Sequence, residues 1–230
     1  QVGDPKALPA LRRGLIDEDP LVAERSMEAL SRMRDVQSMD MILRHLGGPD
    51  PGLRQAAYEA LAEFKGLEKA RSALREGLAS ASPAAQAAAA YGLARHGEEV
   101  GLFKLEGFLE EVAEPYPEGM LAAYYLVRLG KKQGLEYLLR IVEDEKSALR
   151  FGALQALGKA GEAKASASLA KRLEEGKDPA SIRLPLVMAL GRLGGTRAVY
   201  ALKKAALDAD AAVRGAARIA LAELGEYERP

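Results

Sequence analysis

The sequence lacks several residue types that carry specific chemistry. It contains no Cys, no Trp and no Asn among its 230 residues. Without Cys the chain cannot form a disulfide, a thiolate metal site, an iron–sulfur cluster or a cysteine nucleophile. Without Asn it has no acceptor for N-glycosylation.

An excess of charge of one sign and long apolar runs are also missing. The 33 Lys and Arg residues balance the 33 Asp and Glu residues, so the formal net charge is zero, which argues against a dedicated nucleic-acid binder. No apolar run approaches the roughly 18 residues of a membrane span, and the start of the chain does not resemble a signal peptide. We therefore expect a soluble protein without membrane insertion, located in the cytoplasm.

β-Branched residues are scarce, and this indicates the fold class. Val, Ile and Thr number 10, 5 and 1, against 43 Ala and 35 Leu. Ala and Leu favour helices, whereas β-branched residues favour strands. The composition therefore predicts an all-α protein.

A short pattern ending in leucine recurs along the whole chain. The leucines of this pattern, called anchors below, are spaced 31 to 33 residues apart: Leu30, Leu61, Leu93, Leu126, Leu157, Leu190 and Leu221. Four residues after the anchor, five of the seven copies carry a glycine, which is typical of a left-handed helix C-cap. Each copy therefore ends a helix at this point.

The start of the same helix is marked by an N-cap residue and a proline. Asp19-Pro20, Asp50-Pro51, Ser82-Pro83 and Asp178-Pro179 have this form. An amphipathic stretch precedes each pair, so the unit is helix, turn, helix. We expect repeats at about 4–35, 36–66, 67–97, 98–130, 131–161, 162–194 and 195–225, with a tail at 226–230, stacked as one solenoid over 1–230.

Three of these helices resemble a known family. The segments 53–61, 149–158 and 213–221 are similar to the short bacterial HEAT repeats, also called PBS-lyase HEAT-like repeats. The resemblance implies a right-handed α-solenoid, an armadillo/HEAT-like α-α superhelix, of about seven two-helix repeats. No polar capping helix precedes the first repeat, so we expect the chain to be a fragment of a longer one.

The second helix of each repeat has two faces. With the anchor at zero and 100° per residue, the residues eight, four and one before it and three after it form the core face. The resemblance implies that the opposite face lines the concave surface. In repeats three to six that face carries Tyr91, Met120, Tyr124, Phe151, Leu154, Leu184, Val187 and Met188.

These apolar residues allow two interpretations. If they are exposed together, they mark a site for a protein or peptide partner. Alternatively, they belong to the core between repeats. Tyr91, Tyr124 and Met188 are the strongest candidates for binding, because they project furthest from the core direction.

Basic residues recur at two further positions of the helix. Seven residues before the anchor stand Arg54, Arg150, Arg183 and Arg214. The family resemblance favours a structural ladder, in which these arginines bond to carbonyls and aspartates of adjoining turns; Asp50, Asp144, Asp178 and Asp208 or Asp210 lie just upstream. Two residues after the anchor stand Arg95, Arg128, Lys159 and Arg192, either as a solvated edge or as a cationic rim of the apolar strip.

The charges are unevenly divided along the chain. Residues 1–115 carry 14 basic and 19 acidic groups, net −5, and residues 116–230 carry 19 and 14, net +5. Such a dipole could attract an acidic partner to the C-terminal half, or favour self-association.

Motifs for catalysis are missing. The two histidines, His45 and His96, lie in different repeats, and neither is followed by the Glu of a His-Glu metal pair. No Walker loop, dinucleotide fingerprint or nucleophile elbow occurs. We expect no catalytic residue, metal or cofactor, and a non-enzymatic scaffold that binds a protein or peptide. A bilin-lyase-type subunit acting with a partner protein is the alternative, and a DNA-binding HEAT-like protein a remote one.

Overall fold

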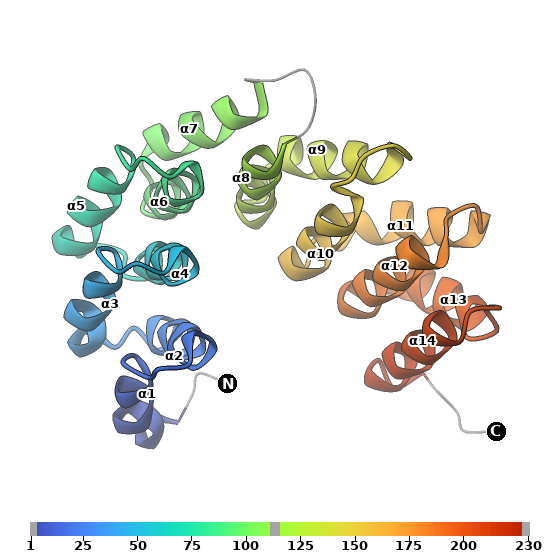
Figure 1. The fold of residues 1–230 in the computed structure, drawn as a ribbon, viewed down its shortest axis with the longest axis horizontal. Helices are drawn as coiled ribbons and strands as arrows, with labels where there is room; N and C mark the ends of the chain where they lie inside the picture. Colours follow the sequence, from blue (N-terminus) through green and yellow to red (C-terminus); the bar gives the residue numbers. More distant parts are fainter. Residues whose placement is uncertain (1–3, 111–115, 227–230) are drawn as a thin grey trace. The chain divides into compact units, whose positions relative to one another are not determined.

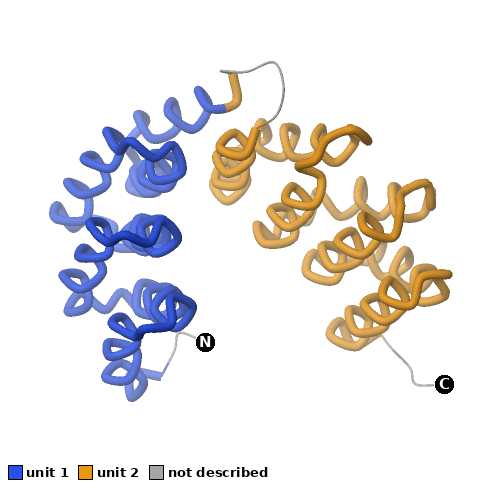
Figure 2. Tube along the Cα trace, viewed as in Figure 1, with its two compact units in different colours: residues 1–108 blue, residues 109–230 orange. Residues whose placement is uncertain are grey.

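The computed structural model describes residues 4–110 and 116–226, and this part of the chain is helical, with 14 α-helices, two short 3₁₀ turns and no strand (Figure 1). Within each unit, successive helices pack in pairs, so the predicted all-α solenoid is confirmed. The chain divides into two compact units, residues 1–108 and 109–230 (Figure 2).

Unit 1 contains the first three helix pairs and most of a seventh helix. Its helices are α1 (Leu8–Gly14), α2 (Pro20–Arg32), α3 (Met39–His45), α4 (Pro51–Leu61), α5 (Glu68–Gly77), α6 (Pro83–Arg95) and α7 (Glu99–Glu110), with 3₁₀ turns η1 (Pro5–Ala7) and η2 (Val36–Ser38). α2, α4 and α6 pack against one another in order, while α1, α3 and α5 cover them.

Unit 2 repeats this arrangement in two layers. Its helices are α8 (Pro117–Arg128), α9 (Lys132–Glu143), α10 (Arg150–Ala160), α11 (Lys164–Glu175), α12 (Ala180–Leu193), α13 (Thr196–Ala205) and α14 (Ala211–Glu223). α8, α10, α12 and α14 contact one another in sequence and form the second-helix layer. α9, α11 and α13 form the first-helix layer, and one apolar core lies between the layers.

Helix starts follow the predicted caps in three of four cases. The carboxylates of Asp19 and Asp50 accept from Leu21 N and Leu53 N, each at 2.9 Å, and Ser82 caps α6 in the same way. The prediction was wrong at Asp178. There Pro179 is the N-cap residue of α12, and the Asp178 carboxylate is instead bound by two arginines.

Helix ends follow the predicted glycines. Gly97, Gly130, Gly161, Gly194 and Gly225 all have positive φ, between 64° and 86°. The first repeat has Arg34 in the equivalent position, also with a left-handed φ of 52°. An L-residue with a side chain is strained in this region, so the repeat geometry overrides the residue's own preference.

Glycines also control how closely the second helices of unit 2 approach. A Cβ built on Gly191 of α12 would lie 2.7 Å from Ala220 Cβ of α14. On Gly158 of α10 it would lie 3.1 Å from Ala189 Cα of α12. These helices therefore pack at close range in the middle of the layer.

Candidate functional site

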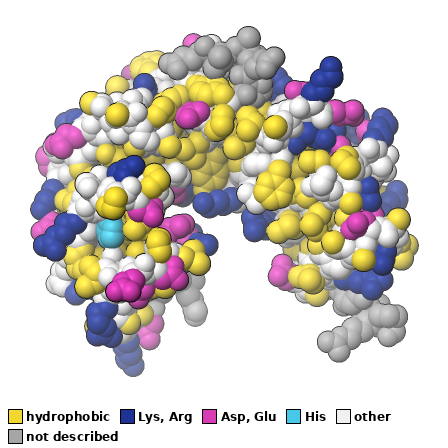
Figure 3. Space-filling view, viewed as in Figure 1, with side chains coloured by type: hydrophobic (Ala, Val, Ile, Leu, Met, Phe, Trp, Pro, Cys, Tyr) yellow, Lys and Arg dark blue, Asp and Glu magenta, His cyan; other side chains and the backbone are white. Residues whose placement is uncertain are grey.

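Large apolar side chains are exposed on successive helices of the second-helix layer of unit 2. Phe151, Met188 and Ile219 are 50%, 46% and 62% exposed, on α10, α12 and α14. Met120 and Leu184 are partly buried and pack against the core beside them. Hydrophobic and basic side chains lie next to one another over this unit in Figure 3. We name this set, Met120, Phe151, Leu184, Met188 and Ile219, the apolar strip.

Four of the predicted strip residues are not at the surface. Tyr91, Leu154 and Val187 are fully buried and Tyr124 is 6% exposed, so the expectation that they form an exposed strip was wrong. Two cations lie over the Tyr124 ring. The guanidinium carbon of Arg128 is 5.7 Å from the ring centroid, and Lys159 Nζ is 5.6 Å from it. Leu154 and Val187 belong to the core of unit 2.

Tyr91 is buried in unit 1 for a comparable reason. Arg95 Nη1 donates to the Tyr91 hydroxyl at 3.3 Å, and its guanidinium lies 6.0 Å from the ring centroid. A helical wheel assigns a direction to each side chain, but it contains no information about what neighbouring side chains cover. For both tyrosines the second interpretation holds, since their side chains are buried.

Ile219 is a strip residue that the sequence reasoning missed. It stands two residues before the anchor Leu221, as Met188 stands two residues before Leu190. The signal that identifies Met188, a large apolar residue two positions before the anchor, therefore also identifies Ile219 in the seventh repeat.

The cationic row beside the strip consists of Arg128, Lys159 and Arg192, one on each of α8, α10 and α12. Lys159 and Arg192 are exposed. Within residues 4–110 and 116–226, neither of these two forms a salt bridge. The aliphatic part of Arg192 runs close to Gly158, since a Cβ on that glycine would lie 3.5 Å from Arg192 Cδ. Positive charge therefore lies directly along the strip.

The equivalent positions of unit 1 have a different electrostatic character. Arg95 forms a salt bridge with Glu63 at 2.8 Å, and Arg32 pairs with Glu28 at 2.7 Å. Both cations of this row in unit 1 are therefore neutralised by carboxylates of the same layer. In the described part of unit 2, by contrast, Lys159 and Arg192 form no salt bridge.

The arginines seven residues before the anchors bind the turns between helices. Arg54 Nη1 donates to the carbonyls of Gly48 and Pro49 at 2.7 and 2.8 Å. Arg214 Nη1 does the same with the carbonyls of Asp208 and Ala209. These contacts hold the first turn of the second helix to the preceding loop.

Two of these arginines also reach the next repeat. Arg183 donates to both carboxylate oxygens of Asp208, at 2.9 and 2.8 Å. Arg150 is buried and donates to Asp178, not to the upstream Asp144 that the sequence suggested. The aspartate partners of Arg150 and Arg183 therefore lie in the turn before the next second helix. Stacking of the repeats brings that turn closer to each arginine than the turn before the arginine's own helix.

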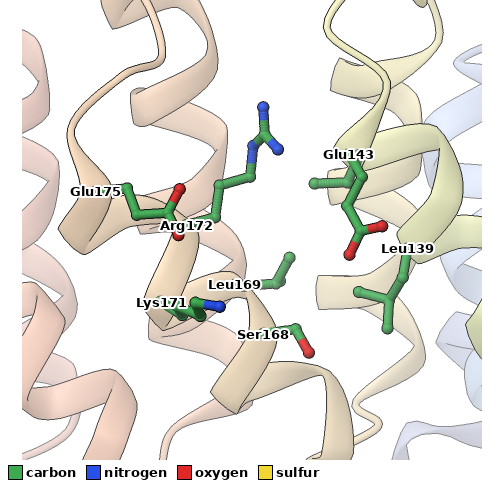
Figure 4. Close-up of a pocket in the computed structure, with 8 residues that line it drawn as sticks. Leu139, Glu143, Ser168, Leu169, Lys171, Arg172 and Glu175 are labelled. Atoms are coloured by element: carbon green, nitrogen blue, oxygen red, sulfur yellow. The ribbon is translucent and has the colours of Figure 1, made fainter.

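The first-helix layer of unit 2 contains a separate groove of about 310 Å³ between α9 and α11. Leu139 and Glu143 on one helix face Ser168 and Leu169 on the other (Figure 4). Lys171, Arg172 and Glu175 complete its lining, and Arg172 is already bound to Asp178. The mixed charges of this lining favour no particular ligand.

The two histidines make backbone contacts between repeats. His45 Nε2 lies 2.8 Å from Leu15 O, and His96 Nε2 lies 3.1 Å from Leu61 O. Burial lowers the pKa of His96, against the opposing effect of the Leu61 carbonyl. In the described residues, no group of three or more His, Cys, Asp and Glu side chains could hold a metal ion.

Comparisons with known proteins place the chain in a family. The sequence matches HEAT repeats over residues 1–62, 39–116 and 119–183. A search of curated proteins found no match. Of the described helices, none is long and apolar enough to span a membrane.

Solved structures with similar helix arrangements include two natural proteins. The complex of CpcE and CpcF of phycocyanin lyase from Nostoc sp. PCC7120 has a TM-score of 0.49 and 18% identity, covering 100% of this chain and 91% of the other. Human deoxyhypusine hydroxylase in complex with glycerol has a TM-score of 0.48 and 20% identity, covering 98% and 86%. On the match over most of its length, the chain belongs to the HEAT-repeat family.

Proposed function

We propose that this HEAT-repeat protein is a non-enzymatic scaffold that binds a protein or peptide partner through the second-helix layer of unit 2. The observation that carries the proposal is the exposure of Phe151, Met188 and Ile219 on three successive helices of one layer. Scattered single apolar residues are ordinary on protein surfaces, whereas a row of large ones is typical of an interaction site.

The surroundings of the strip have the composition of an interface. Apolar side chains occupy its middle, and Lys159 and Arg192 stand at its edge. Interfaces commonly combine an apolar centre with a polar rim, and a few large side chains at the centre carry most of the binding energy. Phe151 and Met188 are the residues expected to act in this way.

A peptide selection tests the proposal directly. A phage library of random peptides would be panned on the wild-type protein and, in parallel, on the double variant Phe151→Ser/Met188→Ser. Both positions are exposed, so the variant should keep its fold. Enriched peptides should bind the wild type and lose at least about tenfold in affinity on the variant, which corresponds to about 1.4 kcal/mol.

The matched control removes exposed aromatic residues elsewhere. Phe103 on α7 and Tyr200 on α13 are 67% and 54% exposed and lie outside the second-helix layer. Phe103→Ser/Tyr200→Ser should bind the selected peptides as the wild type does. If the control variant loses binding and the strip variant keeps it, the strip is not the binding site.

A further inference from the structure

We infer that the partner segment is an extended acidic peptide that crosses α8, α10 and α12, with carboxylates spaced about three residues apart against the cationic row and apolar side chains on the strip. This inference rests on the proposed function and specifies the chemistry and spacing of the partner.

Two cations of the row carry uncompensated charge. Lys159 and Arg192 lie on neighbouring helices and form no salt bridge with any described residue, whereas Arg32 and Arg95 of unit 1 do. Only two acidic residues, Glu118 and Glu223, lie on the four helices of the second-helix layer of unit 2. An acidic ligand would supply the charges that this surface lacks.

The Tyr124 ring fixes the position of two cations of the row. Arg128 and Lys159 come from different helices and both lie within 6 Å of the Tyr124 ring centroid, at 5.7 and 5.6 Å. The ring attracts each cation and keeps both side chains over its face. Tyr124 is therefore a positioning residue for the cationic row.

The distance between neighbouring helices sets the spacing of the carboxylates in the ligand. The three cations stand at the same offset from their anchors, two residues after Leu126, Leu157 and Leu190, so they form one row across the helices. Packed helices lie about 8–10 Å apart, and glycines keep α10 and α12 close. A chain in the extended polyproline II conformation rises about 3.1 Å per residue and has three residues per turn, so about three residues span one helix spacing and every third side chain faces the same side. Carboxylates at positions i, i+3 and i+6 would match the row.

The cationic row ends at α12. At the offset of the cationic row, α14 carries Glu223 in place of a cation, while Ile219 continues the apolar strip. The acidic part of the peptide is therefore expected to end over α12, and an apolar residue to follow it over α14. In unit 1, the residue at the same offset from its anchor is Arg95, which is already paired with Glu63.

A nucleic acid is the competing polyanion, and the surface favours a peptide. Nucleic-acid sites are rich in Lys and Arg that neutralise many phosphates. Here three cations flank a strip of large aliphatic and aromatic side chains, which suits apolar side chains of a peptide better than a sugar-phosphate backbone.

The experiment measures fluorescence anisotropy with synthetic ten-residue peptides. One peptide carries Glu at i, i+3 and i+6 with Leu between them; a second has the same composition with the three Glu contiguous; a third has Lys in place of Glu. The spaced acidic peptide should bind at least about tenfold more tightly than the contiguous one, and its affinity should fall as salt is raised.

Charge reversal identifies the residues. Lys159→Glu/Arg192→Glu should lose binding of the acidic peptide and gain binding of the Lys peptide. The matched control is Lys164→Glu/Lys171→Glu, because both lysines are exposed on α11 in the other layer and the net charge changes equally. This control should bind as the wild type does, and circular dichroism checks that both variants fold.

The outcomes separate this inference from the proposed function. The spaced and contiguous peptides could bind equally well and both lose binding in Phe151→Ser/Met188→Ser. That result would overturn the proposed spacing of the carboxylates and would still support the scaffold function. Tighter, salt-sensitive binding of duplex DNA or single-stranded RNA at the same residues would overturn the peptide. If none of the three peptides binds at up to about 1 mM, the inference fails, and the library selection alone then decides the proposed function.

Discussion

Arg150 of α10 and Asp178, two residues before α12, form a buried ion pair that joins neighbouring repeats. Arg172 of α11 donates to both oxygens of the same carboxylate, at 2.8 and 3.0 Å. One aspartate thus binds two cations from two helices. A buried charge is tolerated only when it is paired in this way, so Asp178 connects three helices of unit 2.

Replacing Asp178 with Ala is expected to destabilise unit 2 strongly. The change leaves the buried Arg150 guanidinium without its carboxylate, and breaking a buried pair in this way costs about 3–5 kcal/mol. Urea unfolding followed by circular dichroism measures the loss. The control is Glu136→Ala, which removes the exposed partner of Lys132 on α9 and should cost less than about 1 kcal/mol. Similar losses for the two variants would contradict the role given to Asp178.

The same site predicts how stability changes with pH. Burial raises the pKa of Asp178, but hydrogen bonds from Arg172 and Arg150 outweigh it and hold the pKa below the usual 3.8. The unfolded state therefore binds a proton more readily than the folded state. The stabilisation is complete above about pH 3.8 and is lost as the pH falls through the lower folded value. Urea unfolding between pH 5 and 2.5 should show a steeper loss for the wild type than for Asp178→Asn.

The fold was predictable because its signals repeat. Seven anchor leucines, five of them followed after four residues by a glycine, mark the ends of helices, so the pattern remains readable where one copy departs from it. The pattern survives even where Arg34 replaces the glycine, because packing of the repeat fixes the backbone there. The N-caps were less predictable, because the Asp178 carboxylate does not cap α12 and instead binds arginines that lie 28 and 6 residues away in the sequence.

The candidate site was only partly predictable, for a physical reason. Tyr124 and Met188 both stand two residues before an anchor, yet one is buried and the other is exposed. The difference comes from Arg128 and Lys159, whose side chains cover the tyrosine ring. Helix periodicity gives the direction of a side chain, whereas exposure depends on long neighbouring side chains that fold back over it.

Arg34 offers a test of backbone strain. It has a left-handed φ of 52° at the position where later repeats carry glycine. A residue with a Cβ costs about 1–2 kcal/mol in this region. Arg34→Gly should therefore stabilise unit 1, by about 1 kcal/mol after the greater entropy of glycine in the unfolded chain is included. Urea unfolding gives the change, and Gly97→Ala, at the equivalent position with φ of 86°, should change stability in the opposite direction. A loss of stability in Arg34→Gly would show that the left-handed backbone at Arg34 does not raise the free energy of the folded state.

Two helical glycines of the second-helix layer should respond to alanine in opposite ways. At Gly191 the added methyl would lie 2.7 Å from Ala220 Cβ, so α12 and α14 must separate; overpacking of this kind costs about 1–3 kcal/mol. At Gly215 of α14 no atom lies within 4 Å of the added methyl, so alanine should stabilise the helix by about 0.5–1 kcal/mol. Because both substitutions have the same helix propensity, the difference between their unfolding free energies isolates the contact between α12 and α14. Equal stabilisation by both would mean that the two helices do not pack as closely as described.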